Sequence, residues 1–348
     1  MGTSPRRPPA ARVAVFAACA LALGAAAWAF VSCTRGEAPS AAAPAPPSAF
    51  AIAAPRAGDA AGAAEASTPV PVRFAAIGDT GRGTSAQIKV AQALAAKCAR
   101  DGCDFVLFLG DNVYPSGLES ADDPRMRALV DDVYGAEGPE IFAVLGNHDY
   151  GGNGSGLELH KGRYQIDYTD RSKRWRMPGA WYRATRGPVE LFALDSTMQL
   201  FGRDEAQRRD VSAWIAASTA RWKIAVAHHP YRSNGLHGNA GAYDGIPIPP
   251  SSGKGVRDFD DAVICGKVDL LLSGHDHSRQ WLTDTCRGTE LVVSGTGAEG
   301  TELPGHEPTH YQSIGLGFVY FVIDGGRLNA EFVDDEAQTE YTHTLTKT

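Results

Sequence analysis

The sequence has no excess of basic charge. Its 348 residues include 33 Lys and Arg against 40 Asp and Glu, which gives a net charge of -7. Proteins that bind nucleic acids usually show a basic excess, so we expect no nucleic-acid partner. The net charge does not exclude anionic ligands, because a bound metal ion can supply positive charge locally.

Cysteine is also sparse, and no Cys-x-x-Cys spacing indicates a structural zinc site. Of the six cysteines, two lie in the N-terminal segment and the other four are Cys98, Cys103, Cys265 and Cys286. In an oxidising compartment four cysteines allow three pairings. The two local pairings, 98 with 103 and 265 with 286, are the simplest.

The N-terminal segment combines positive charge with an apolar run. Three arginines precede residues 13–31, which contain no charge. The run is near the lower limit for crossing a bilayer and long for a signal-peptide core. We predict that residues 1–33 direct export with the positive end inside. Three outcomes stay open: cleavage to a periplasmic or secreted protein, retention as a membrane tether, or lipidation at Cys33, where Val31-Ser32-Cys33 resembles a bacterial lipoprotein signal.

The next segment, residues 34–69, is dominated by Ala, Pro, Ser and Gly. Such a composition buries too little apolar surface to offset the entropy of ordering, so we expect a disordered linker. Residues 70–348 then form one catalytic domain, which we expect to be a monomer.

Within that domain, short apolar runs end in Gly, Asp, Asn or His. Such runs are typical of buried strands, and they cover residues 72–77, 105–109, 141–145, 191–194, 224–227 and 270–273. Polar residues at strand ends are where an α/β sheet gathers its active site. We expect the loops of five of these strands to meet at one edge of a sheet.

The spacing of apolar residues predicts helices at 85–97 and 211–217. The first would bury Ile88, Ala91, Ala95 and Cys98 and be capped by Thr84 or Ser85. Three later strands, 291–294, 317–323 and 328–333, lack long intervening helices and are expected to be antiparallel. The pattern predicts an α/β fold. Together with the family resemblance described below, it implies two mixed sheets flanked by helices in a four-layer αββα sandwich.

The polar clusters have the chemistry of a metal site. Two buried carboxylates, Asp79 and Asp111, would repel each other unless a cation lay beside them. The other clusters add an amide and imidazoles, and this mixture of oxygen and nitrogen donors suits iron, manganese or zinc rather than calcium. Two metals about 4 Å apart can hold both the attacking and the leaving oxygen of a displacement.

Five clusters, in order, resemble the motifs of the purple acid phosphatases, a branch of the calcineurin-like metallophosphoesterases. They are Gly-Asp-Thr-Gly at 78–81, Gly-Asp-Asn-Val-Tyr at 110–114, Gly-Asn-His-Asp at 146–149, Ala-Val-Ala-His at 225–228 and Gly-His-Asp-His at 274–277. Within that family the chain looks most like the small, tartrate-resistant type. The likeness covers essentially all of residues 71–300.

The resemblance implies a set of metal ligands. Asp79, Tyr114 and His277 would hold Fe(III), and Asp111 would bridge to a second, divalent ion of Fe, Zn or Mn. Asn147, His228 and His275 would hold that second ion. His228 is preferred to His229 because it lies two residues before Pro230 and nine before His237, which is the family's spacing. Most other metallophosphoesterases have a histidine where this chain has Gly81, and this chain offers the Tyr114 phenolate instead. This difference separates it from other branches of the superfamily, the calcineurin-like phosphatases and the cyclic-nucleotide phosphodiesterases.

The resemblance also implies the reaction. A metal-bound hydroxide would attack a phosphate monoester in line, with His148 and His237 binding the phosphate and His237 protonating the leaving group. Asp149 and Asp195 would orient histidines beside the metals. The substrate would be a small phosphate ester. Two alternatives stay open: phosphodiesterase or phospholipase-type activity at the same site, and a catalytically inactive metal- or phosphate-binding protein.

Overall fold

A computed structural model describes residues 70–348 of the chain. The predicted export signal, the linker and Cys33 lie outside the described residues. Among residues 70–348, no helix is both long enough and apolar enough to cross a membrane.

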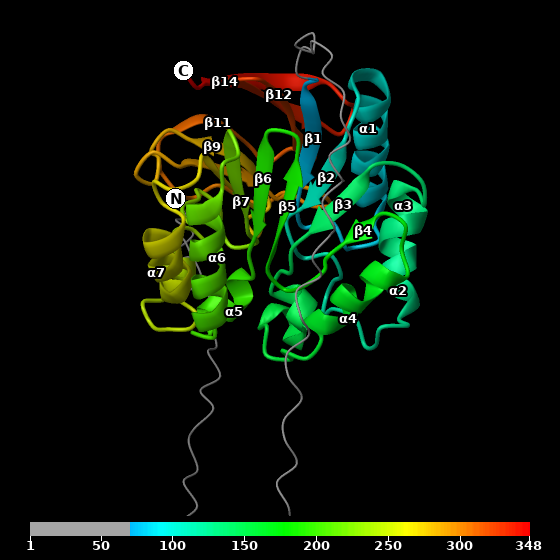
Figure 1. Ribbon diagram of the computed structural model, residues 1–348. Coiled ribbons are helices and arrows are strands. Elements are labelled where there is room, and N and C mark those ends of the chain that lie inside the picture. Colours follow the sequence, from blue (N-terminus) through cyan, green and yellow to red (C-terminus); the bar gives the residue numbers. More distant parts are fainter. Residues whose placement is uncertain (1–69) are drawn as a thin grey trace, which may run out of the picture. The chain divides into compact units, whose positions relative to one another are not determined.

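Two seven-stranded sheets form the centre of the domain (Figure 1). The first sheet has the order β14 (Thr339–Thr346), β13 (Arg327–Asp334), β12 (Gly317–Asp324), β1 (Val72–Ile77), β2 (Phe105–Phe108), β3 (Glu140–Ala143) and β4 (Trp175–Arg176). The second has the order β11 (Thr309–Ser313), β9 (Arg279–Leu282), β10 (Glu290–Ser294), β8 (Leu270–Ser273), β7 (Trp222–Val226), β6 (Val189–Ala193) and β5 (Tyr182–Arg186).

Both sheets are mixed. Strands β1 to β4 run parallel, and so do β6, β7, β8 and β10. The antiparallel pairing predicted for the later strands holds for β12 with β13. It is wrong for β10 and its neighbour β8, which are parallel with Leu291 opposite Leu271. The chain makes this crossover through strand β9, which pairs antiparallel to β10, so no helix is needed between the parallel strands.

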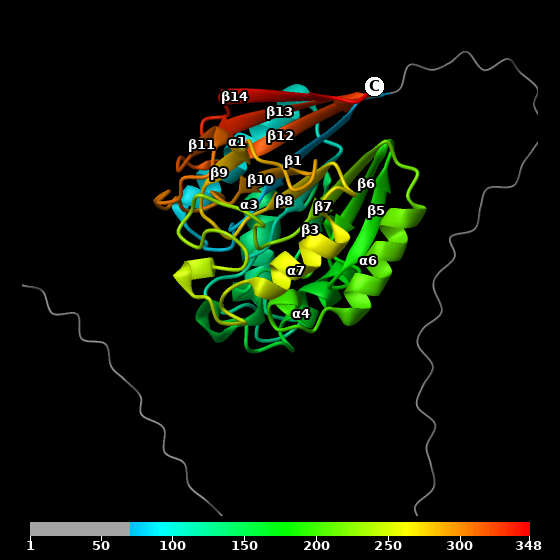
Figure 2. The ribbon, with the colours of Figure 1, turned by 90° about the vertical axis from the view of Figure 1, so that its left-hand side faces the viewer.

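The helices cover the two outer faces (Figures 1 and 2). They are α1 (Ser85–Asp101), α2 (Pro124–Met126), α3 (Asp132–Tyr134), α4 (Gly162–Asp167), α5 (Ser196–Leu200), α6 (Glu205–Ala217) and α7 (Lys254–Val263). One apolar core joins the two sheets, and a second packs α6 and α7 against the outer face of the second sheet. The predicted αββα sandwich is confirmed.

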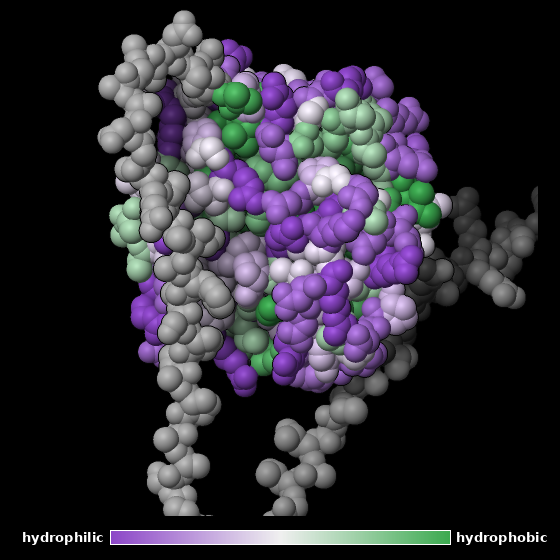
Figure 3. All heavy atoms as spheres, turned by 45° about the vertical axis from the view of Figure 1, so that its right-hand side comes forward, coloured by the Kyte–Doolittle hydropathy of each residue, from purple (hydrophilic) through white to green (hydrophobic). Residues whose placement is uncertain are grey.

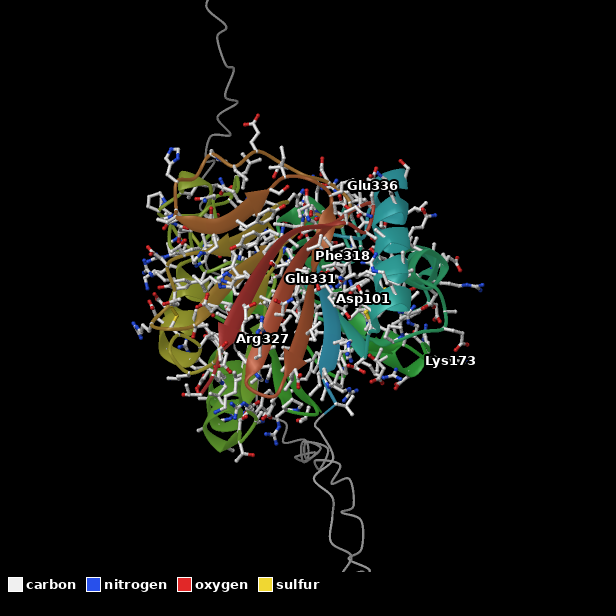
Figure 4. The ribbon with its side chains drawn as sticks, turned by 90° about the horizontal axis from the view of Figure 1, so that it is seen from above. Asp101, Lys173, Phe318, Arg327, Glu331 and Glu336 are labelled. Carbon is white, nitrogen blue, oxygen red and sulfur yellow. A yellow bond between two sulfur atoms is a disulfide. The ribbon has the colours of Figure 1, made fainter. Side chains whose placement is uncertain are left out.

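Helix α1 is longer than predicted, and the face that it buries matches the predicted face only in part. Thr84 caps it by accepting a hydrogen bond from the Gln87 amide. Val90, Leu94 and Lys97 are buried, whereas Ile88 is 44% exposed. The predicted face is right for Ala91, which is buried, and for Cys98, which packs on the core. It is wrong for Ile88 and Ala95, which are exposed. Lys97 Nζ lies 2.7 Å from Glu331 of β13 and 2.8 Å from Asp101; Figure 4 labels both carboxylates.

Two disulfides join Cys98 to Cys103 and Cys265 to Cys286. They are the two local pairings, which are thereby confirmed. The first closes the end of α1 onto the approach to β2, and the second ties the residues after α7 to the turn before β10. The molecular face shown in Figure 3 is largely hydrophilic, with its apolar side chains in small separate patches.

Candidate metal centre

The predicted ligands come together at the carboxyl ends of five strands. Those strands are β1, β2 and β3 of the first sheet and β7 and β8 of the second. We expected the five loops to meet at one edge of a single sheet. Instead, they meet where strands of both sheets end. Hydrogen bonds join the two sheets there: Gly78 N donates to Ser294 O at 2.7 Å, and Ser294 Oγ donates to Ala76 O at 2.8 Å.

Three of the donor atoms form a first group. The Tyr114 hydroxyl oxygen lies 3.2 Å from Asp79 Oδ1 and 3.2 Å from His277 Nε2. The His277 nitrogen lies 3.6 Å from the same Asp79 oxygen. Donors about 2.1 Å from one ion, at right angles, stand about 3 Å apart. This spacing therefore fits three ligands around one metal position.

A second group lies beside the first. His228 Nε2 is 2.9 Å from Asn147 Oδ1 and 3.2 Å from His275 Nδ1. The other His228 ring nitrogen lies 2.9 Å from the Leu109 carbonyl, which fixes the ring so that Nε2 faces the group. These three predicted ligands therefore surround a second position.

Asp111 faces both groups. Its Oδ1 lies 3.5 Å from His228 Nε2, in the second group. On the other side, burial and, next, the charge of Asp111 raise the pKa of Tyr114 in the first group. The His148 amide donates to Asp111 Oδ1 at 2.9 Å and holds the carboxylate in place. This position suits the bridging role predicted for Asp111.

Without a bound cation, the charged forms of these carboxyl and imidazole groups are unfavourable. Burial, and next the charge of Asp111, raises the pKa of Asp79 well above its usual range. Burial lowers the pKa of His228 and of His275, and lowers that of His277 to about 4. Neutral imidazoles are the form that binds metals, and a cation would favour the ionised carboxylate. The donor set therefore fits metal ions.

The backbone around the donors is held in an uncommon conformation. Asp79, Asp111 and His275 have φ angles of 60°, 54° and 69°. Non-glycine residues rarely adopt this left-handed region, and such strain gathers at functional sites. Close packing also restricts the neighbours: a Cβ at Gly146 would lie 2.2 Å from Asp111 Oδ1, and one at Gly110 would lie 2.6 Å from His228 Nδ1.

The two predicted catalytic histidines lie on opposite sides of the donors. His148 Nδ1 is 2.7 Å from the Pro115 carbonyl, and its ring packs on Tyr114 with centroids 4.3 Å apart. The His237 ring stacks on His275 at 4.0 Å, and its Nδ1 lies 2.8 Å from Asp244 Oδ1. The sequence reasoning missed Asp244, which follows a glycine-rich loop and carries no motif.

Asp149 and Asp195, predicted to orient histidines, hydrogen-bond to backbone amides and to other side chains within residues 70–348. Asp149 is fully buried and accepts hydrogen bonds from the amides of Asn112, Val113 and Gly146. It therefore ties together the loops that follow β2 and β3. Asp195 accepts from the Tyr150 hydroxyl at 2.5 Å and caps α5 through the Met198 amide. Both carboxylates are occupied by structural hydrogen bonds.

His229 is also buried beside the second group. Together with His228 and His275 it forms a cluster with one nitrogen atom from each residue within 4.8 Å of the others. However, its Nδ1 lies 2.8 Å from the Ser196 hydroxyl, which in turn accepts from the His229 amide. The choice of His228 as the ligand stays a prediction.

An αββα fold with carboxylate, phenol, amide and imidazole donors at the ends of strands of both sheets is typical of metal-dependent phosphoesterases. The family model for the calcineurin-like phosphoesterases matches residues 72–279. Tartrate-resistant acid phosphatase type 5 of Sus scrofa is 31% identical over 266 residues, covering 67% of this chain and 71% of that protein. Purple acid phosphatase 17 of Arabidopsis thaliana is 29% identical over 291 residues, covering 77% and 79%.

The chain therefore belongs to the calcineurin-like phosphoesterase family, on the branch of the purple acid phosphatases. Among solved structures, GAP50, the anchor in the inner membrane complex of Plasmodium, superposes with a TM-score of 0.64 at 22% identity. The match covers 80% of this chain and 89% of that one. At this identity it supports the fold alone.

Proposed function

We propose that this chain is an exported acid phosphatase that hydrolyses phosphate monoesters with two metal ions, Fe(III) and a divalent ion of Fe, Zn or Mn. The observation that carries the proposal is the convergence of seven donor residues in two groups, with Asp111 facing both. When bound, two such ions supply a nucleophile in acid and neutralise phosphoryl oxygens. Export places the enzyme in the periplasm or outside the cell, released, tethered or lipidated at Cys33.

The chain's own residues bind the ester and move the proton. Asp244 accepts from His237 Nδ1, which leaves Nε2 to hold the proton that the reaction needs. As the ester P–O bond breaks, that proton goes to the leaving oxygen, while water supplies the oxygen that joins phosphorus and restores the proton. His148, fixed by the Pro115 carbonyl, binds a phosphoryl oxygen on the other side.

The fold alone does not carry this proposal, since GAP50 shares the fold and is described as an anchor. What supports activity is that all seven predicted ligand positions and both histidines are present. The decisive measurement is phosphate release at acid pH from phenyl phosphate and from diphenyl phosphate by the metal-loaded protein. We expect the monoester to be the faster substrate.

His228→Ala tests the site within the same assay, and His310→Ala, an exposed histidine on β11, is its matched control. We expect a loss of at least about a hundredfold in kcat for the first, since it removes one of the metal's ligands, and none for the control. Faster cleavage of the diester would establish a phosphodiesterase instead. A metal-loaded wild type that cleaves neither ester would establish a binding protein.

A further inference from the structure

We propose that the cavity beside His237 receives the leaving group of the ester and selects an uncharged, apolar alcohol, such as a phenol, over one that carries negative charge. The inference rests on the proposed function, because a leaving group exists only if the chain cleaves phosphate esters. It adds the class of substrate that this site prefers.

The position of the cavity assigns it to the leaving group. It has a volume of about 380 Å³, and its inner wall includes Asn147 and His275 of the second donor group and the proposed acid His237. A group bonded to the oxygen that His237 protonates must extend on this side. The rest of the wall is mainly apolar: Leu157, Leu200, Phe201 and Pro250 line it, together with Gly154, Tyr243 and the two serines Ser155 and Ser251.

The charge of the cavity wall determines the selection. No lysine or arginine lines this cavity among the described residues, and its one carboxylate, Asp244, is paired with His237. An anionic group on the leaving alcohol, lying beyond His237, would lose its hydration against apolar side chains and meet no lysine or arginine there, which is costly. An aromatic ring, in contrast, would bury apolar surface against Phe201 and Leu157.

A second cavity on the far side of the donors differs in this respect. It has a volume of about 330 Å³ and is lined by Arg82, Tyr114 and His148 among others. Arg82 is already engaged, since it lies 2.7 Å from Glu299 and its guanidinium carbon stands 4.2 Å over the Tyr114 ring. The Arg82 guanidinium is therefore held away from the cavity beside His237.

Exposed apolar side chains are concentrated on the two loops that contribute residues to the wall of this cavity. Of the seven large hydrophobic residues that are exposed within residues 70–348, four lie on the two loops that flank it: Leu157, Leu236, Ile246 and Ile248. Leu157 is 68% exposed although it lines the cavity. Grouped exposed apolar residues beside a site indicate a surface that an apolar ligand covers.

The test compares kcat/KM for phenyl phosphate and 4-carboxyphenyl phosphate, using the metal-loaded full-length chain. The carboxylate does not make the phenolate a poorer leaving group, so chemistry alone would not favour the uncharged ester. We expect the wild type to prefer phenyl phosphate about tenfold or more, the effect of about 1.4 kcal/mol of charge mismatch. Leu157→Lys adds a cation to the wall and should reduce or reverse that preference.

Ile88→Lys is the matched control, because Ile88 is also an exposed apolar residue but lies on α1 and lines neither cavity. It should leave the ratio of the two rates unchanged. A wild-type ratio near one, or an equal change of the ratio in both variants, would overturn the proposal while leaving the phosphatase intact. A chain that cleaves neither ester would refute the proposed function and, with it, this inference.

Discussion

At the scale of single residues, Tyr114 distinguishes this site most sharply from other two-metal sites. Burial and the charges of Asp111 and Asp79 hold the pKa of its phenol well above the usual range. Without metal the hydroxyl therefore keeps its proton and donates to Asp79 at 3.2 Å. A ferric ion would reverse this balance, because it binds the hard anionic phenolate.

We expect Tyr114→Phe to remove the visible absorption of the iron-loaded protein and to lower its iron content. The measurement is a visible spectrum together with metal analysis of the purified protein. Tyr341→Phe is a suitable control, since Tyr341 lies on the edge strand β14, which β13 and β12 separate from β1. A wild type without colour or without iron would disprove the ferric assignment and leave a two-metal hydrolase of another kind.

Asp244 is the second residue whose role can be tested alone. Its hydrogen bond to His237 Nδ1 holds the ring in the orientation that a proton donor needs. We expect Asp244→Asn to lower kcat about tenfold for an alkyl phosphate, whose leaving oxygen must be protonated, and much less for 4-nitrophenyl phosphate. Asp284→Asn, an exposed carboxylate near Arg232, is the control. Equal losses on both esters would mean that Asp244 acts only on structure.

The site shows which residues a sequence can predict and which it cannot. Each predicted ligand follows an apolar strand within a few residues, so a local pattern marks it. Asp244 contacts His237 only because the loop between them folds back, with Asp244 at a φ of 54°. The hydrogen bonds of Asp149 could not be predicted from the sequence either, because its partners Asn112 and Val113 lie in another loop.

At the scale of elements, a buried ion pair fastens α1 to the first sheet. The Lys97 side chain is 3% exposed, and its Nζ contacts Glu331 and Asp101 and lies 4.5 Å over the Tyr320 ring. We expect Lys97→Met to lower the free energy of unfolding by about 2 kcal/mol, less than for a fully buried pair because both carboxylates stay partly hydrated. Chemical denaturation measures the change.

The pH dependence of that loss follows from Asp101. The hydrogen bond from Lys97 holds the pKa of Asp101 below its usual range, so this contribution is present above about pH 4 and is lost as the pH falls through the lowered value. The difference between wild type and Lys97→Met should therefore shrink in acid. Lys89→Met is the control: Lys89 is 48% exposed and pairs with Asp335 and Glu336, the latter labelled in Figure 4. An equal effect in both variants would contradict the prediction.

The elements themselves were predicted unevenly. The central strands β1 and β8 were predicted with their observed ends, because buried strands read as continuous apolar runs. The spacing of apolar residues predicted the buried face of helix α1 only in part, because the helix is rich in alanine and its buried face includes Lys97. Strand β14 was not predicted, because it is an edge strand whose side chains are mostly exposed and polar.

At the scale of the whole domain, the proposed metal ligands come from both sheets. Asp79, Tyr114 and Asn147 follow strands of the first sheet, and His228 and His275 follow strands of the second. Each proposed position takes ligands from both, since the first group also includes His277, which follows β8. Bound metals would therefore hold the two sheets together at this end, and their binding energy would add to the stability of the fold.

Removal of metal should accordingly destabilise the protein. At a hundredfold excess of free metal over Kd, one ion adds about 2.7 kcal/mol to the free energy of unfolding, so a chelator should lower Tm by several degrees. Because Asp111 faces both groups, Asp111→Asn should lose both ions, whereas Asn147→Ala should lose only the second. Metal analysis and thermal melting of the two variants check this. If Asp111→Asn kept one ion with an unchanged Tm, Asp111 would be a ligand of one metal only, and the two positions would not depend on a shared carboxylate.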